Sequence, residues 1–340
     1  MRYINKERYG NMKVAIIGSN SFSGSSFVSY LIYKKIKVFG FSRSSEVRKI
    51  FAPYKEHNNY KKYFQFTKVD LNISKDIDKI IKILKRNKIE YIVNFASQGM
   101  VAESWINPED WYRTNVVSSS LLINKIKKLK IKKYLNFSTP EVYGDTKGLI
   151  KEHDFFKPST PYAVSRSAQD LNLKAYLHTF QFPVVFTRAA NVYGPHQQLY
   201  RIIPKTIIKS LKNETLQLHG GGKSVRSFIH INDVSRALFK ILFDKNNVGE
   251  TYHISTKEFI SIKNLVKKIH RKLKTKPRVI NALERSGKDN GYFLSSSKLK
   301  KELNWKPKIN LDYGLEHTIN WIIKEFNLIK NKELNYIHKK

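Results

Sequence analysis

Near its start the chain reads Val14-Ala15-Ile16-Ile17-Gly18-Ser19-Asn20-Ser21-Phe22-Ser23-Gly24, and these residues determine its fold class. The four apolar residues predict a buried strand, and the glycine-rich turn after them leads into a helix. Backbone N–H groups at the start of such a helix bind the pyrophosphate of a dinucleotide, and glycine lets the two approach closely. The usual motif has a third glycine where Ser21 stands, and serine is small enough to be tolerated there. The stretch therefore predicts a dinucleotide site formed by Gly18, Ser21, Phe22, Ser23 and Gly24.

The alternation of apolar runs with helical periods continues to about residue 190. Further strands are predicted at Val38-Phe41, Phe64-Val69, Tyr91-Phe95, Lys133-Phe137 and Val184-Thr187, and helices at Gly24-Tyr33, Ile77-Arg86, Asp110-Leu129 and Tyr162-Phe180. This alternation is typical of the α/β class, with a doubly wound parallel sheet of the Rossmann type.

Beyond Asn191 the elements become shorter and mixed, which predicts a smaller C-terminal lobe for the substrate. Helices are expected near Pro204-Leu211, Asp233-Phe243, Ile262-Leu273 and Tyr313-Lys324, and strands near Leu216-Leu218 and Arg226-Ile229. The expected division is a loose extension over 1–12, a dinucleotide-binding domain over 13–190 and a second lobe over 191–330, packed as one unit.

Composition excludes several classes of protein. There is no cysteine, so disulfides, zinc-thiolate sites and thiol nucleophiles are excluded, and no metal site is expected. No apolar run approaches the roughly twenty residues of a membrane helix, and the first residues lack the apolar core of a secretory signal. We therefore expect a cytoplasmic protein without a membrane partner.

The formal net charge of +36 raises nucleic acid as a partner. The lysines, however, are spread from Lys6 to Lys340, whereas a nucleic-acid footprint would cluster on one face. We expect no nucleic-acid partner, and we expect the positive field to favour an anionic substrate such as a sugar diphosphate.

The end of the second strand bears on the choice of cofactor. A site specific for NAD usually places an acidic residue there on the ribose diol, and this chain has Ser42 and Arg43 instead. A guanidinium pairs well with the 2′-phosphate of NADP. NAD and NADP both remain open, with Arg43 favouring NADP slightly.

A second group of motifs carries candidate catalytic residues. Ser138-Thr139-Pro140-Glu141-Val142-Tyr143-Gly144 follows a predicted strand, and Tyr162 and Arg166 lie one turn apart on one face of a predicted helix. We expect the cation of Arg166 to lower the pKa of the Tyr162 phenol toward a value usable for proton transfer.

These motifs resemble the extended short-chain dehydrogenase/reductase superfamily over residues 13–326, in particular its nucleotide-sugar 4,6-dehydratases acting on dTDP-glucose or, more distantly, GDP-mannose. The resemblance implies a nucleotide-sugar substrate, a structural asparagine at Asn115, and a homodimer formed through helices near 110–129 and 162–180. It implies cofactor contacts by Asp70, Leu71, Phe95, Ala96, Ser97, Tyr162 and Arg166, and substrate contacts by Gln98, Thr139, Asn191, Arg201, Arg226 and Arg285.

Within this resemblance, Glu141 favours a dehydratase, because a carboxylate can remove the C5 proton once C4 has been oxidised. Thr139 would then bind the C4 oxygen and Tyr162 would take its proton. Two residues depart from the pattern of the dTDP-glucose enzymes: Pro140 replaces an aspartate and Arg166 replaces a lysine. Three alternatives stay open, namely a sugar 4-epimerase, a GDP-mannose 4,6-dehydratase and a non-catalytic cofactor- or RNA-binding protein.

Overall fold

The computed structural model describes residues 12–284, 287 and 291–339, and it is built around a seven-stranded sheet. The strands lie in the order β11-β7-β5-β4-β1-β2-β3, and every neighbouring pair is parallel. They are β1 (Lys13–Ile17), β2 (Lys37–Ser42), β3 (Phe64–Lys68), β4 (Tyr91–Asn94), β5 (Lys133–Ser138), β7 (Val184–Ala189) and β11 (Thr251–Ile254). The predicted doubly wound sheet is confirmed, and its order reverses between β1 and β4.

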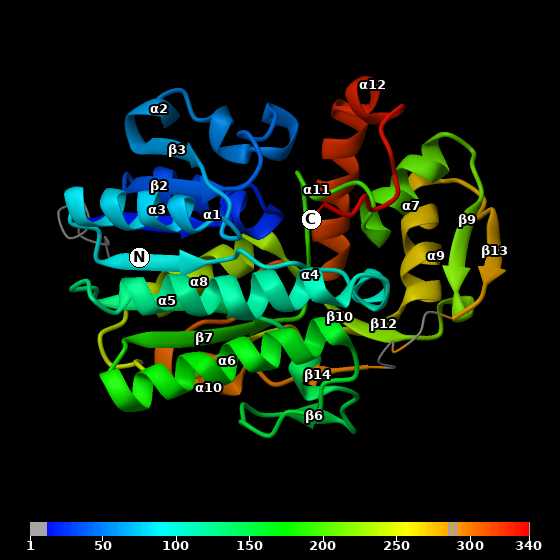
Figure 1. The fold of residues 1–340 in the computed structure, drawn as a ribbon. Helices are drawn as coiled ribbons and strands as arrows, with labels where there is room; N and C mark the ends of the chain where they lie inside the picture. The colour runs from blue at the N-terminus through cyan, green and yellow to red at the C-terminus, as the bar shows by residue number, and fades with distance from the viewer. Residues whose placement is uncertain (1–11, 285–286, 288–290, 340) are drawn as a thin grey trace.

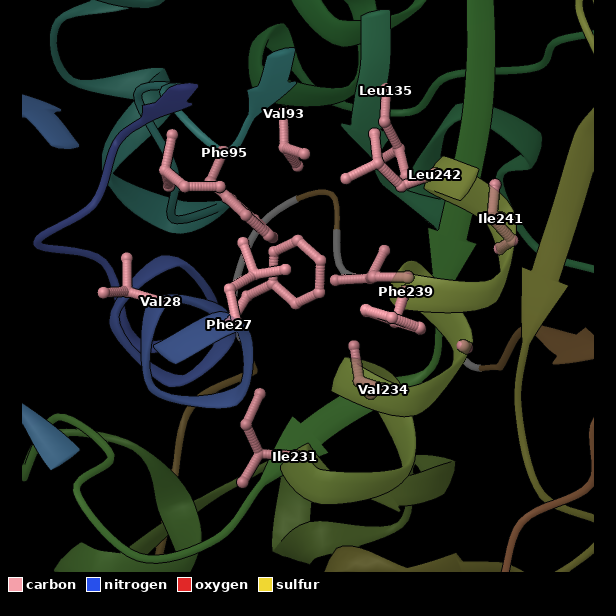
Figure 2. Packing of buried hydrophobic residues seen from close by; sticks show 14 of the residues in the cluster. Phe27, Val28, Val93, Phe95, Leu135, Ile231, Val234, Phe239, Ile241 and Leu242 are labelled. Atoms are coloured by element: carbon pink, nitrogen blue, oxygen red, sulfur yellow. The ribbon is translucent and has the colours of Figure 1, made fainter. Parts of the chain in front are cut away.

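Helices cover both faces of this sheet because its strands are apolar on both sides. In β1, Val14 and Ile16 belong to the core on one face, whereas Ala15 and Ile17 belong to the core on the other. The first face packs against α1 (Phe22–Tyr33) and α8 (Ile231–Phe243), whose apolar side chains meet between the helices and the sheet (Figure 2). The second face packs against α3 (Ser74–Arg86), α5 (Ser119–Ile126) and α6 (Pro161–Phe180).

The helix predicted over 110–129 is divided into three parts. It begins as α4 (Pro108–Tyr112), continues as a π-helical turn at Arg113–Ser118 and ends as α5. A π turn holds one more residue than an α turn, and such turns often occur at functional sites. Asn115 lies inside this one and is fully buried.

The remaining elements form a second lobe at the carboxyl end of the sheet, seen on the right of Figure 1. Its strands are β8 (Asn191–Tyr193), β9 (Leu216–His219), β10 (Val225–His230), β12 (Phe259–Ser261) and β13 (Val279–Ala282), and its helices are α7 (Ile202–Leu211), α9 (Ile262–Leu273), α11 (Leu311–Lys324) and α12 (Phe326–Ile329). Short elements complete the chain: α2 (Tyr60–Tyr63), β6 (Leu149–Ile150), β14 (Phe293–Leu294) and α10 (Ser297–Leu303).

The second lobe is not one continuous stretch of chain. After β10 the chain returns to the large sheet, where α8 covers one face and β11 pairs with β7. Most of the extension expected over 1–12 lies outside the described residues. None of the helices in 12–284, 287 and 291–339 combines the length and apolar character needed to cross a bilayer.

Candidate active site at the carboxyl edge of the sheet

Two adjoining cavities open where β1, β2, β4 and β5 end. The smaller one, about 150 Å³, is lined by Gly18, Ser21, Ser42, Arg43, Asp70, Leu71, Phe95, Ala96, Ser97 and Gln98. The larger one, about 800 Å³, extends under the second lobe and is lined by Ser21, Phe22, Ser23, Gln98, Thr139, Glu141, Tyr162, Arg166, Asn191, Arg201 and Arg226. Together they bring most of the predicted site residues to one cleft. Gly24 lies behind the cavity wall, and Arg285 lies outside the described residues.

The glycine-rich turn is shaped by close backbone approaches. Gly18 has φ +85°, and a Cβ there would lie 2.6 Å from the backbone nitrogen of Ala96, at the end of β4. A Cβ on Gly24 would lie 2.3 Å from the carbonyl oxygen of Gly18, so this glycine is needed for the turn itself.

Ser21 takes the place of the motif's middle glycine by capping α1. Its hydroxyl accepts a hydrogen bond from the N–H of Gly24 (3.0 Å) and donates one to the carbonyl of Gly18 (2.8 Å). The N–H groups of Phe22 and Ser23, in the first turn, have no acceptor within the helix. This is the arrangement that binds a pyrophosphate.

Beside this turn, the two residues expected at the ribose are already engaged by protein. The hydroxyl of Ser42 accepts a hydrogen bond from the N–H of Asn20 (2.9 Å), so it supports the turn. Arg43 donates to the Oε1 of Gln98 (3.3 Å) and lines both cavities. Asp70 accepts from the N–H of Asn72 (2.9 Å), which stabilises the loop after β3.

Asn115 anchors the loop after β4. Its side chain accepts from the N–H of Gln98 (2.7 Å) and donates to the carbonyl of Gln98 (3.0 Å) and the hydroxyl of Ser165 in α6 (2.9 Å). The buried amide therefore holds the cofactor loop against the helix that carries Tyr162.

Thr139, Glu141 and Tyr162 meet in the larger cavity. Thr139 caps a short 3₁₀ helix at residues 140–143 that presents Glu141, and Thr160 caps α6 by accepting from the N–H of Ala163 (3.1 Å). Thr139 hydrogen-bonds to Tyr162, and the charge of Glu141 acts on the same phenol. The two caps thus bring the three groups to one place.

The expected lowering of the Tyr162 pKa was wrong for the protein alone. Burial raises the pKa of this phenol above its usual value, and the negative charge of Glu141 raises it further. Arg166, Thr139 and Arg201 act in the opposite direction without outweighing these effects. The expectation included the cation but neither burial nor the carboxylate.

Arg166 keeps a buried donor that has no partner among the described residues. The side chain is buried, and one terminal nitrogen donates to the carbonyl of Phe137 (2.6 Å). Its Nε finds no hydrogen-bond partner among the described residues, although the residue lines the cleft. A ribose hydroxyl would satisfy this donor, so the site fits a dinucleotide.

A buried ionic network lies behind the catalytic groups and escaped the sequence analysis. Asp170 of α6 accepts from Arg188 of β7 (2.9 Å), from Ser138 (2.7 Å) and from Asn136 (2.9 Å). Arg188 and Asp170 are both fully buried, and Arg188 also donates to the hydroxyl of Tyr143 (2.5 Å). The network ties the end of β5 to α6, which fixes Thr139 relative to Tyr162.

The second lobe contributes polar groups to the opposite wall. The hydroxyl of Tyr292 donates to the Oδ1 of Asn191 (2.6 Å), and the guanidinium of Arg226 lies 4.9 Å from the centre of the Tyr292 ring. Tyr292 was not anticipated. Arg201, at the start of α7, lines the same wall.

Comparisons with known proteins agree with this geometry. A family model described as GDP-mannose 4,6 dehydratase matches residues 16–318. A dTDP-D-glucose 4,6-dehydratase of Mus musculus is 33% identical over 256 residues, which cover 72% of this chain and 71% of that protein.

A trifunctional Arabidopsis thaliana protein that includes a UDP-glucose 4,6-dehydratase is 30% identical over 325 residues, covering 92% of this chain. The chain spans about half (47%) of that relative. A dTDP-glucose 4,6-dehydratase from Streptomyces venezuelae, solved with NAD bound, is 26% identical with a TM-score of 0.85, covering 93% of this chain and 98% of the other.

Proposed function

Because this chain belongs to the GDP-mannose 4,6-dehydratase family, we propose that it removes water from a nucleotide-activated hexose to give the 4-keto-6-deoxy sugar. One observation carries the proposal. Glu141 and Tyr162 line the same cavity, and they are close enough for the charge of Glu141 to raise the pKa of Tyr162. A base for the C4 hydroxyl and a base for the C5 proton are therefore available at one sugar ring.

The residues divide the reaction between them. The glycine-rich turn and Arg166 would hold a nicotinamide dinucleotide, which would supply an acceptor for the C4 hydride and its return at C6. Tyr162 takes the proton of the C4 hydroxyl, and Thr139 orients that oxygen. The resulting ketone acidifies C5, and Glu141 removes the C5 proton as the C6 hydroxyl leaves.

Glu141 also supplies the proton that the leaving hydroxyl needs. Pro140 has no proton to give, and it lies buried at the start of the short helix. The proton taken from C5 can pass through the Glu141 carboxyl to the C6 oxygen, so water leaves with no other acid. When C6 regains its hydride, C5 takes up a proton that comes from solvent.

We assign the nucleotide diphosphate to the wall formed by Asn191, Arg226 and Arg201, and we propose dTDP-glucose as the substrate. The mouse and Streptomyces relatives support this choice. Gln197 and Gln198 line the cavity together with Arg201.

The cofactor is a nicotinamide dinucleotide, and we propose that Arg43 would donate to the 2′-phosphate if that dinucleotide is NADP. Comparing the binding of NADH and NADPH to wild-type protein and to Arg43→Ala tests this. The substitution should weaken NADPH and spare NADH. Equal effects on both would mean that Arg43 does not contact the 2′-phosphate.

Mass spectrometry tests the dehydratase. The protein is incubated in deuterium oxide with dTDP-glucose, GDP-mannose and UDP-glucose in turn. The expected product has lost one water and carries deuterium at C5, and Glu141→Gln should abolish it while Tyr162 still supports C4 oxidation. A C4 epimer without loss of water would contradict the proposal and identify a 4-epimerase.

We also propose that the protein is a homodimer through α5 and α6. Leu121 on α5, Val164 and Leu171 on α6, and Val117 in the π-helical turn before α5 are exposed, and exposed apolar side chains favour a protein partner. Leu121→Glu with Leu171→Glu should halve the mass measured by ultracentrifugation, whereas Ile280→Glu, at an exposed site on β13, should not. An unchanged dimer in the double variant would place the interface elsewhere.

A further inference from the structure

Residues 334–339 run from the second lobe back to the junction of the two lobes. Leu334 is buried in the same apolar cluster as Ile329 of α12, so the segment begins firmly attached to the second lobe. In Figure 1 this red segment descends from α12 and ends between α11 and α4.

The first half of the segment stays on the second lobe. Lys205 of α7 donates to the Oδ1 of Asn335 (2.9 Å). The rings of Tyr336 and Tyr200 meet edge to face, with their centres 5.3 Å apart. These contacts place the segment along the mouth of the larger cavity, which Leu334, Asn335 and Tyr336 help to line.

The second half is attached to the dinucleotide-binding side. The ring of His338 stacks on Trp111 of α4, with centres 5.0 Å apart and planes 8° from parallel. Its Nε2 lies 2.7 Å from the carboxylate of Asp110, so this nitrogen is the donor. The other ring nitrogen, Nδ1, then accepts from the Nε2 of Gln98 (3.1 Å).

Gln98 connects the segment to the cofactor site. Its amide nitrogen also donates to the carbonyl of Lys339 (2.8 Å), while its Oε1 accepts from Arg43. Gln98 lines both cavities, so the segment holds a residue at their junction. The cavities stay open with the segment in place, and it therefore forms a wall of the cleft.

We propose that residues 335–339 are a strap that ties the two lobes together and retains the dinucleotide through each turnover. The inference rests on the proposed function. In a dehydration the hydride removed at C4 must be returned at C6. If the reduced dinucleotide dissociated between these two steps, the oxidised sugar could not be reduced at C6. Slow release of the dinucleotide therefore lets the reaction reach its product. His338 is a positioning residue in this scheme, because it acts through Gln98 and Trp111.

The rate of NADH release tests the strap without any turnover. NADH bound to wild-type protein, His338→Ala and Tyr336→Ala is chased with excess NAD, and the loss of nicotinamide fluorescence is followed in a stopped-flow instrument. His338→Ala removes a ring stack and two hydrogen bonds, so release should become about tenfold faster or more. Ile337→Ala is the matched control, because Ile337 lies in the same segment but is 65% exposed; its release rate should equal that of wild type.

Two results would overturn the strap. Release from His338→Ala at the wild-type rate would show that the segment retains nothing. If NADH entered His338→Ala faster than wild type but left it at the same rate, the variant would bind NADH more tightly. The segment would then obstruct the site and would not retain the cofactor. A wild-type protein that binds neither NADH nor NADPH would instead contradict the proposed function.

A spin label gives an independent measurement that does not depend on the cofactor. The chain has no cysteine, so Ile337→Cys provides a single thiol for a nitroxide. Its spectrum should show restricted motion in the otherwise wild-type protein and sharper lines when His338→Ala is added. Sharp lines in both would mean that the segment is not docked.

Discussion

Replacing Asp170 by asparagine should destabilise the protein far more than a change of one oxygen suggests. The carboxylate accepts from Arg188 and Ser138 through one oxygen and from Asn136 through the other, all without access to water. An asparagine at this position keeps one acceptor oxygen and turns an N–H₂ group toward a donor. Arg188 is then a buried charge without a counterion, and removing one partner of such a pair costs about 3–5 kcal/mol.

The electrostatics of Arg188 indicate the same direction. Burial by itself lowers the pKa of this guanidinium, but the neighbouring Asp170 and Tyr143 outweigh burial and raise it. The ion pair therefore stabilises the buried positive charge of Arg188. Asp170→Asn removes the larger of the two interactions that stabilise this charge.

Urea unfolding followed by tryptophan fluorescence measures the effect, provided that the slope of unfolding free energy against urea is unchanged. Asp154→Asn is the matched control. Asp154 pairs with Lys174 of α6, the helix that carries Asp170, but Asp154 is 64% exposed. An exposed pair contributes about 0–1 kcal/mol. If Asp170→Asn lost no more stability than Asp154→Asn, the reasoning about buried charge would be refuted.

Three further predictions concern the site and its surroundings. Arg166→Met should weaken NADH binding about tenfold or more in fluorescence titrations, because a charged donor is lost, whereas Arg166→Lys should retain most of the affinity. Because burial and Glu141 raise the pKa of Tyr162, the rate of C4 oxidation should rise from neutral to alkaline pH, and a burst of NADH absorbance measures this rate. Glu141→Gln should move the rise to lower pH. An unchanged pH profile would contradict an effect of the Glu141 charge on the pKa of Tyr162. Burial and Arg188 lower the pKa of His253 to about 3. Between about pH 6.5 and 3 this histidine therefore binds a proton in the unfolded chain but not in the folded protein. The unfolding free energy should therefore fall by about 1.4 kcal/mol per pH unit as the pH drops through this window. His253→Gln should remove this dependence on pH. If the variant lost stability in acid as steeply as the wild type, His253 would not be the group responsible.

Much of the fold was predictable because local patterns determined it. The strands and helices of the doubly wound sheet follow from buried apolar runs that alternate with helical periods. Strand β11 was missed: Thr251–Ile254 is a short run, and it joins the sheet only because the chain returns from the second lobe to pair with β7.

The parts of the site that escaped prediction depend on contacts distant in sequence. Nothing in the residues around Asp170 of helix α6 indicates that its partner is Arg188 on strand β7. The strap is similar, since Gln98 and His338 meet across 240 positions of the chain. The pKa of Tyr162 was predicted in the wrong direction because burial cannot be read from the spacing of Tyr162 and Arg166.

The π-helical turn at Arg113–Ser118 contributes both to the candidate site and to the surface proposed for the dimer. Asn115 in this turn is buried and holds Gln98 and Ser165, whereas Val117 in the same turn and Leu121 in α5 are exposed. A π turn accommodates its extra residue within one turn, so deleting a single residue here would restore α-helical spacing while the helix beyond the turn keeps its direction. The effect would be confined to this turn, where the buried Asn115 and the exposed Val117 could not both keep their present directions.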